Sequence, residues 1–388
     1  MISSGIEFKN FREKNSNSKI KKIWTSLVYE FSQENNDLLL SLSKKYKYSF
    51  KFSNLVKFKK LNLFHIIGMG GSSLGSQAIY NFLSDKVKKK FLFTNNITPN
   101  KNLKIKEKKL IIIISKSGNT LETLSNFNSQ KIKKNCLFIT ENRQSYLRTL
   151  AYKLQSEVID HSNFIGGRYS VLSETGMVPA YLMGLDPNKF KQFDNLIKNK
   201  KFINCLINNT MSLLKLHNQN KKNSIILNYD ESSNDLFYWY QQLVAESLGK
   251  NSKGILPIVS SVPKDNHSVM QLYLDGFKNN FFTFFYVKET STQKIDDNSV
   301  LNSHNYLKNK SMSDVLFAQF RATQKVFIKK NIPFRTFIIK KRDEKTLGEL
   351  FTFFILETIL LAKAMKINPF DQPAVELIKK ETLKILKN

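Results

Sequence analysis

Three apolar segments in the first half of the chain are each followed directly by a stretch of helical periodicity. They are LNLFHIIG (61–68), KKLIIIIS (108–115) and NCLFIT (135–140). Continuous apolar runs of this length are typical of strands that are buried on both faces. Their alternation with helices predicts a mainly parallel sheet with helices packed on both sides.

The same alternation returns in the second half of the chain. The predicted strands there are 223–229, 280–287 and 333–339, and the predicted helices are 235–249, 313–329 and 344–365. A chain of 388 residues is long for one core, so we expect an α/β fold of two tandem units.

The units are expected to divide near the segment GLDPNKF (184–190). We assign 59–186 to the first domain and 187–388, with its C-terminal helices, to the second. Residues 1–58 carry no site chemistry and lean toward helix, so we expect a helical extension that packs on the second domain.

The net charge of +30 has three competing explanations, which are a nucleic-acid surface, a membrane surface and a lysine-rich background. The basic residues are mostly lysines spread along the whole chain rather than one arginine stripe. A dedicated nucleic-acid binder favours a concentrated patch. We therefore expect no specific nucleic-acid or membrane partner, although the charge alone attracts polyanions weakly.

The cysteine count and the apolar segments indicate a cytoplasmic protein. Two cysteines, Cys136 and Cys205, fit a reducing compartment and provide no zinc-site spacing. The N-terminus lacks the apolar core of a signal peptide. The most apolar stretch, 349–365, is interrupted by Glu357 and Lys363 and therefore predicts a buried helix rather than a membrane span.

In open parallel sheets, ligands bind beyond the carboxyl ends of the strands. The first turn at such an end in this chain is GMGGSSLGS (68–76). A dinucleotide-binding fingerprint would need glycine at Ser73, and a nucleotide P-loop would need lysine at Ser76. What remains is a strand-to-helix turn with free backbone N–H groups, which favours anions. The alternative is a tight turn whose glycines serve only the backbone.

The second turn, SKSGNT (115–120), has the mixture of groups that a phosphate monoester needs. Ser115, Ser117 and Thr120 supply hydroxyl groups and Lys116 supplies a positive charge. The alternative is a serine that caps the following helix beside a solvated lysine. Because two such turns are expected at the same sheet edge, phosphate binding is the better interpretation.

Five segments in order resemble the glucose-6-phosphate isomerase family of sugar-isomerase domain proteins. The first segment consists of the two turns described above, counted together. The other four are GGRYSVLSETG (166–176), AESLGKNSKG (245–254), DNHSVMQLYLDG (265–276) and FDQPAVELIKK (370–380). The resemblance covers about 60–380 and implies two tandem sugar-isomerase-type domains. It also implies interconversion of glucose 6-phosphate and fructose 6-phosphate by proton transfer through an enediol(ate).

The resemblance implies a role for each of five residues. Glu246 matches the base that moves the proton, and Arg168 matches the cation that stabilises the enediolate. His267 and Lys379 match the groups that open the sugar ring, and Glu122 matches the carboxylate that orients the histidine. Without the resemblance, each would be read as an ordinary surface or helix residue, and Lys380 is a competing register for the lysine.

The resemblance also implies the substrate contacts. Gln242 matches a residue that contacts the sugar, and the phosphate contacts fall on Gly71, Ser72, Ser115, Lys116, Ser117 and Thr120. The resemblance implies no metal and no organic cofactor. It implies a homodimer, because the family supplies the histidine across a dimer interface. A bifunctional phosphoglucose/phosphomannose isomerase and a noncatalytic sugar-phosphate sensor remain alternatives, and a nucleic-acid-binding protein is a third.

Overall fold

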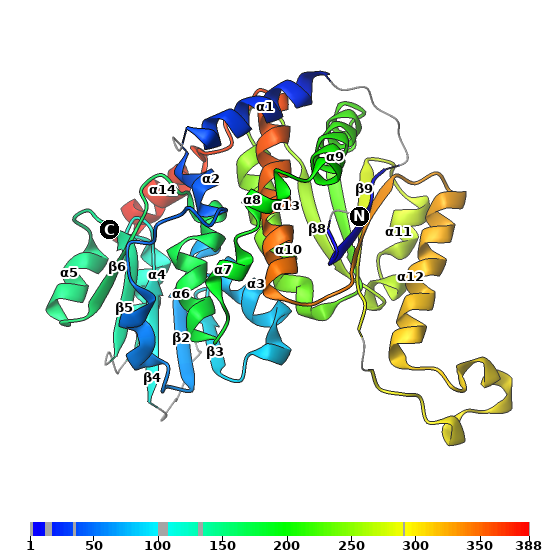
Figure 1. Cartoon of the computed structure of the whole chain (residues 1–388), viewed down its shortest axis with the longest axis horizontal. Coiled ribbons are helices and arrows are strands. Elements are labelled where there is room, and N and C mark those ends of the chain that lie inside the picture. Colours follow the sequence, from blue (N-terminus) through cyan, green and yellow to red (C-terminus); the bar gives the residue numbers. More distant parts are fainter. Residues whose placement is uncertain are drawn as a thin grey trace.

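The computed structural model describes residues 3–11, 18–33, 36–99, 108–130, 135–289 and 292–387. It contains two five-stranded sheets with helices between and outside them (Figure 1). The first sheet has the order β3-β2-β4-β5-β6, and all of its neighbouring strands are parallel. Its strands are β2 (Leu63–Gly68), β3 (Lys90–Thr94), β4 (Lys109–Ile114), β5 (Cys136–Glu141) and β6 (Glu157–His161).

The second sheet has the order β1-β10-β9-β7-β8 and is parallel except for β1, which runs antiparallel to β10. Its strands are β1 (Ile6–Lys9), β7 (Asn223–Asn228), β8 (Leu256–Ser261), β9 (Asn280–Val287) and β10 (Phe334–Ile339). The two sheets with their helices confirm the predicted α/β fold class.

The α-helices of the first half and of the region that follows it are α1 (Ser18–Ser32), α2 (Asp37–Ser41), α3 (Leu74–Phe82), α4 (Leu121–Asn128), α5 (Tyr146–Lys153), α6 (Glu174–Leu182), α7 (Pro187–Phe190), α8 (Phe193–Leu196) and α9 (Lys200–Asn218). Those of the remainder are α10 (Asn234–Leu248), α11 (Met270–Asp275), α12 (Met312–Lys329), α13 (Glu344–Ala364) and α14 (Val375–Lys387). Four 3₁₀ turns are important below: η1 (Phe52–Phe58), η2 (Gly70–Ser72), η4 (Gly167–Leu172) and η6 (Lys264–His267).

The strands are buried on both faces, which explains their continuous apolar runs. In β4, Ile111 and Ile113 pack with residues of α4 and α5, whereas Ile112 and Ile114 face the central helices. The second sheet repeats this arrangement, with α11 and α12 on its outer face and the same central helical layer on its inner face (Figure 1). One continuous core between the sheets therefore holds the two units together.

Polar side chains also join the two units. Asp235 at the start of α10 accepts hydrogen bonds from Gln77, at 3.0 Å, and from Asn81. The guanidinium of Arg342 donates to Asp230 at 2.9 Å and to the carbonyl of Phe82 at 3.1 Å. These contacts fix α10, which carries predicted site residues, against α3 at the edge of the first sheet.

The N-terminal region contacts both units. Strand β1 lies in the second sheet, so this region contains a strand as well as the expected helices. Helix α1 packs against α9 and α13 of the second unit, whereas α2 contacts η4 and η1 contacts α6. The expected division near residue 186 stays a proposal, and α7, just beyond it, packs against α13.

Across the described ranges, none of the helices combines the length and the apolar content that crossing a bilayer requires. Helix α13 is buried along almost its whole length, as the sequence predicts for 344–365. Its Glu357 forms an ion pair with the fully buried Arg335 of β10. The apolar character of this helix thus reflects its place in the core between the sheets.

Candidate active site

The two glycine- and serine-rich turns lie side by side at the carboxyl edge of the first sheet. Strands β2 and β4 are hydrogen-bonded neighbours, so their following turns begin at the same edge. A Cβ atom placed on Gly68 would lie 3.0 Å from the carbonyl oxygen of Ile114 and 3.1 Å from the Cβ of Ser72. The predicted meeting of the two turns is therefore present in the structure.

In the second turn, the hydroxyl groups gather around the start of α4. The Oγ of Ser115 and the Oγ1 of Thr120 lie 2.8 Å apart. Gly118 has a φ of +66°, and a Cβ there would lie 2.2 Å from the Oγ of Ser145. A side chain at this position would clash with Ser145 and would strain the backbone, so the tight turn that leads into α4 requires glycine.

Lys116 is held at the rim of this turn by groups that the sequence interpretation did not identify. Its Nζ donates to the carbonyl of Asn163 at 2.8 Å and lies 3.4 Å from the carboxylate of Glu141. Glu141 is buried at the end of β5 and also pairs with Arg143 at 2.7 Å. The Glu141 carboxylate thus partly balances the positive charge of Lys116, the residue that the sequence assigns to phosphate binding.

The first turn is wedged between η4 and α10. A Cβ on Gly71 would lie 2.2 Å from the carbonyl carbon and oxygen of Gly167 and 2.6 Å from the backbone nitrogen of Arg168. Gly70 has a φ of +53°, and a Cβ there would lie 2.7 Å from the side-chain nitrogen of Gln242. These contacts bring the predicted phosphate turn, the predicted cation and the predicted sugar contact together.

Glu246 lies in the same cluster, one helical turn after Gln242 on α10. One of its carboxylate oxygens accepts from the guanidinium of Arg168 at 3.2 Å, and the other accepts from the amide of Gln242 at 2.9 Å. About a third of the Glu246 side chain is exposed. The structure thus places a carboxylate that is open to solvent beside a fixed cation.

Arg168 is only 2% exposed, and hydrogen bonds fix its guanidinium in place. Its Nε donates to Ser247 at 2.9 Å, one terminal nitrogen donates to Gln372 at 2.7 Å, and the other donates to the carbonyl of Pro369. The hydroxyl of Tyr169 bonds to the same Ser247 and Pro369, and burial raises the pKa of this phenol. Such preorganised donors are what charge stabilisation in an active site requires.

Ser73, in the first turn, does not take part in this cluster. The side chain is buried, and its Oγ donates to the carbonyl of Gly68 at 2.9 Å. It therefore supports the turn from behind and does not face the cluster around Glu246.

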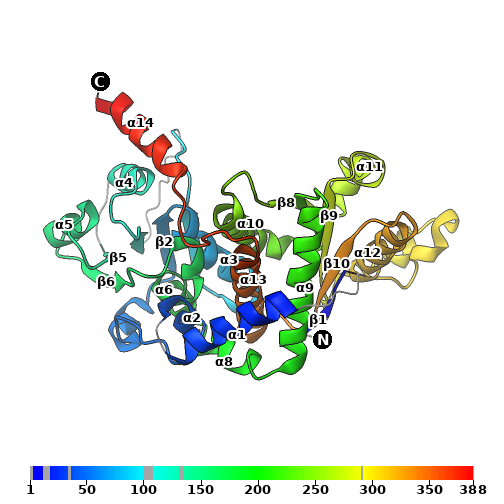
Figure 2. The same cartoon turned by 90° about the horizontal axis from the view of Figure 1, so that it is seen from above.

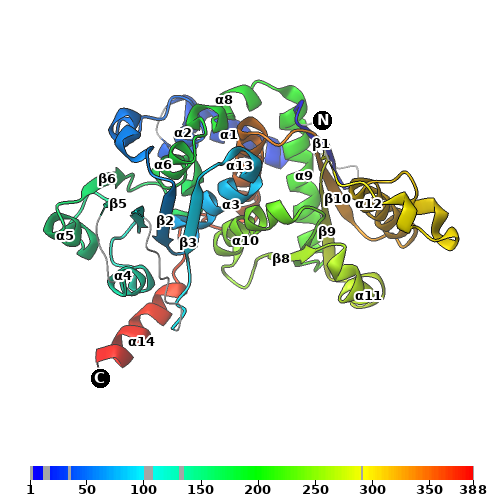
Figure 3. The same cartoon turned by 90° about the horizontal axis from the view of Figure 1, so that it is seen from below.

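Three predicted residues lie apart from this cluster. His267 is exposed in η6, beyond the carboxyl end of β8 in the second sheet. Glu122 lies in the first turn of α4, and within the described ranges no hydrogen bond or ion pair joins it to His267. Lys379 lies on α14, which projects from the body beyond α4, and its ammonium pairs with Glu376 at 2.6 Å (Figures 2 and 3).

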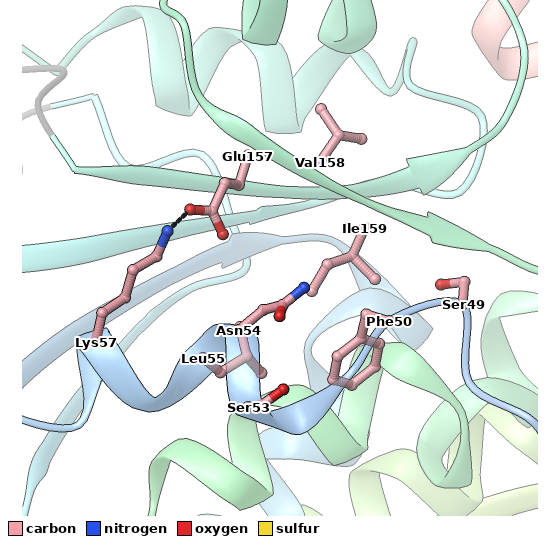
Figure 4. Close-up of a pocket in the computed structure, with 9 residues that line it drawn as sticks. All are labelled: Ser49, Phe50, Ser53, Asn54, Leu55, Lys57, Glu157, Val158 and Ile159. Carbon is pink, nitrogen blue, oxygen red and sulfur yellow. Dashed lines mark hydrogen bonds and ion pairs between the residues drawn. The ribbon is translucent and has the colours of Figure 1, made fainter.

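The two clearest cavities lie on another side of the first unit. One, of about 520 Å³, is formed between β6 and η1 and is crossed by the ion pair of Lys57 and Glu157 (Figure 4). The other, of about 360 Å³, lies next to it beside His161 and Glu174. Neither of these two cavities is lined by a predicted site residue.

The described residues also contain no group of three or more His, Cys, Asp or Glu side chains that could hold a metal ion. The candidate cluster itself presents a carboxylate, a guanidinium and several hydroxyl groups.

Known proteins resemble the chain over most of its length. The family model described as phosphoglucose isomerase matches residues 55–388. A glucose-6-phosphate isomerase from Methanocaldococcus jannaschii is 33% identical over 362 residues, which cover 86% of this chain and 87% of that protein. A glucose-6-phosphate isomerase from Campylobacter jejuni is 31% identical over 352 residues, covering 83% and 84%.

Solved structures support the same fold. A hypothetical protein from Thermus thermophilus superposes with a TM-score of 0.84 at 21% identity and covers 95% of each chain. A glucose-6-phosphate isomerase from Chlamydia trachomatis superposes with a TM-score of 0.68 at 20% identity, covering 97% of this chain and 76% of that one. The family match over residues 55–388 contains every motif of the candidate site, and the chain belongs to the phosphoglucose isomerase family.

Proposed function

We propose that this chain interconverts glucose 6-phosphate and fructose 6-phosphate. The observation that carries the proposal is the contact of Glu246 with Arg168 directly beside the two turns after β2 and β4. An aldose–ketose isomerisation needs a base that can return its proton, a cation for the negative charge that develops, and an anchor for the phosphate. The family membership and the geometry both support these three parts.

In this proposal, Glu246 takes the proton from C2 of the open-chain aldose and delivers it to C1. The hydroxyl protons redistribute in the enediol(ate), so the reaction has no net gain or loss of electrons. Arg168 stabilises the negative oxygen of the intermediate from its fixed position. Gln242, which donates to Glu246, is placed to align the carboxylate and to contact the sugar.

The phosphate is assigned to the two turns. The hydroxyl groups of Ser115, Ser117 and Thr120, together with Ser72 and the backbone of Gly71, supply neutral donors. The start of α4 adds N–H groups and a favourable dipole. Lys116 supplies the charge, which Glu141 partly balances.

Replacing Lys116 by Ala is expected to raise KM more than it lowers kcat, because the ammonium lies at the phosphate end and not at the reacting carbons. The expected rise in KM is about tenfold, a typical effect of losing a charge-assisted hydrogen bond at a partly exposed position. Steady-state kinetics on fructose 6-phosphate measure both constants. The control is Lys153→Ala, an exposed lysine on α5, and an unchanged KM for Lys116→Ala would remove Lys116 from the phosphate site.

We also propose that the active form is a homodimer and that His267 of one copy serves the site of the other. Within one chain, His267 lies on the second unit and Glu122 lies on the first, with no bond between them. Helix α14 is a further argument for a dimer. Its residues Val375, Ile378 and Ile385 form an exposed apolar stripe next to Lys379, which a second copy of the chain could cover. His267 and Lys379 are assigned to ring opening and Glu122 to orienting the histidine.

Mixing two inactive variants tests this arrangement. Glu246→Gln and His267→Ala are each expected to be inactive alone, but a mixed dimer contains one site with both groups intact. Random exchange of subunits would then restore about a quarter of the wild-type activity, because half of the dimers are mixed and each has one working site. No recovery after subunit exchange, with dimers verified by light scattering, would contradict a shared site.

A coupled assay on the purified protein tests the proposed function directly. Conversion of fructose 6-phosphate is expected without added metal and in the presence of a chelator. Mannose 6-phosphate, assayed beside it, separates the bifunctional alternative. Binding of glucose 6-phosphate without turnover would favour a sensor and would contradict the proposed activity.

The same proposal places the protein in glycolysis and gluconeogenesis and in the cytoplasm. The two cysteines are free, which fits a reducing compartment. Fractionation of the cells that express the chain, followed by the isomerase assay, tests this location.

A further inference from the structure

Two cations, Arg168 and Lys250, hold residues 368–372 of the linker between α13 and α14. This linker, residues 365–374, sets where α14 and its Lys379 lie relative to the rest of the site. Within the described ranges, α14 has no buried residue, and the side-chain hydrogen bonds of Lys379, Thr382 and Lys384 all stay inside the helix. The position of α14 on the single chain is therefore determined largely by the linker.

Arg168 is the first cation, and Lys250 is the second. The ammonium of Lys250 donates to the carbonyl of Asp371 at 2.6 Å, to the Asp371 carboxylate at 2.8 Å and to the carbonyl of Asn368. The Asp371 carbonyl also accepts from Arg168 at 3.2 Å, so the two cations share one oxygen. The Lys250 bond lowers the pKa of Asp371, as expected for a carboxylate beside a cation.

Lys250 differs from Arg168 in what it contacts. Arg168 also pairs with Glu246, whereas the three hydrogen bonds that the Lys250 ammonium donates all go to the linker. The Lys250 side chain is only 11% exposed although Asp371 is 52% exposed, so the lysine, more than its partner, is fixed by the protein. It follows the end of α10 by two residues, and α10 carries Glu246.

We propose that Lys250 is a positioning residue that holds α14 in register with Glu246. Glu246 lies in the last turn of α10, and Lys250 follows the end of this helix. Lys250 fixes the linker that leads to Lys379. One short segment thereby sets the distance between the proposed base and the proposed ring-opening lysine. This inference rests on the proposed function for its catalytic consequence, but the hold on α14 is a structural property that can be measured separately.

The structural test is limited trypsin digestion of the full-length protein, with mass spectrometry of the released C-terminal fragments. Lys250→Met is expected to speed cleavage at Lys366, Lys379 and Lys380 about tenfold, because cleavage follows the population of the released linker. The matched control is Lys153→Met, at an exposed lysine on α5 far from the linker. Lys250→Arg keeps the cation and is expected to restore slow cleavage.

The kinetic test is a double-mutant comparison with Lys379→Met. Lys250→Met alone is expected to lower kcat/KM about 10- to 100-fold, a typical cost of displacing a catalytic group by about 1 Å. In the Lys379→Met background, it is expected to have little further effect, because the residue that it positions is already gone. Lys153→Met is expected to stay within about twofold of wild type.

The outcomes separate the two proposals. Unchanged trypsin cleavage in a folded Lys250→Met protein would overturn the positioning role, and so would fully additive effects of the two substitutions. A wild-type protein without isomerase activity would contradict the proposed function, while accelerated cleavage in Lys250→Met would still establish the hold on α14. Lys250→Met could also fail to fold. In that case, slow cleavage and normal activity of the Lys250→Arg protein would support the role of the cation.

Discussion

Replacing Glu246 by Gln is expected to abolish isomerisation while leaving sugar-phosphate binding largely intact. The amide has nearly the same shape and can keep the contact with Gln242, but it cannot accept and return a proton. General-base participation typically contributes about 10²- to 10⁴-fold, so kcat should fall by at least that factor. Stopped assays measure turnover, and calorimetric titration with glucose 6-phosphate measures binding.

A direct proton-exchange measurement makes this test sharper. Wild-type protein in D₂O is expected to incorporate deuterium at C2 of glucose 6-phosphate, and the Glu246→Gln variant is not. The matched control is Glu231→Gln, the same substitution at an exposed glutamate in the turn before α10. Normal turnover by Glu246→Gln would remove Glu246 from the mechanism.

Replacing Gly71 by Ala is expected to damage the site through packing alone. The added Cβ would lie 2.2 Å from the backbone of Gly167, so either η2 or η4 must move. Overpacking of this kind typically costs about 1–3 kcal/mol in the free energy of unfolding. Because η4 begins with Gly167 and Arg168, kcat/KM should fall by about 10²-fold as the guanidinium is displaced.

Gly166→Ala is the matched control. A Cβ there would meet its nearest neighbour, a ring carbon of Tyr169, at an ordinary 3.7 Å, and Gly166 has a φ of −66° that alanine adopts easily. Thermal unfolding and steady-state kinetics are measured for both variants. The difference between them gives the effect of the clash at Gly71, because both variants replace a glycine by alanine. If Gly71→Ala were as active and stable as Gly166→Ala, the turn would not support Arg168 in the way described.

The sequence predicted the interior of both sheets but not their edges. The six predicted strands all exist, as β2, β4, β5, β7, β9 and β10, and each lies between two neighbours. The four strands that were not predicted, β1, β3, β6 and β8, are the four edge strands. A central strand is buried on both faces and reads as a continuous apolar run. An edge strand is partly exposed, as in the alternating pattern of Glu157–His161, and gives a weaker signal.

The site shows a similar division. Residues in the turns after predicted strands could be placed from the sequence, because the carboxyl ends of neighbouring parallel strands meet. Arg168 and Glu246 come from 3₁₀ and helical segments, and only the family motifs identified them. Ser247, Gln372 and Lys250 were not assigned, although each lies within a quoted motif, since spacing along the chain does not show which backbone carbonyls a side chain reaches.

Glu141 could have been found by the rule that found Ser115. It directly follows the predicted strand at 135–140, two residues past the last apolar position, Ile139, and lies at the same sheet edge as the two turns. His267, Glu122 and Lys379 are a different case. Their assigned roles need partners that a single chain does not bring to them, so they stay predictions.

Strand β1 has a consequence for the order in which the protein can form during synthesis. Ile6 pairs with Ile339, so this edge of the second sheet cannot close until nearly the whole chain has left the ribosome. The first sheet draws on residues 63–161 and can form much earlier. Until β10 has been made, β1 would leave its row of backbone donors and acceptors unpaired, and chaperones that shield such rows would act at this stage.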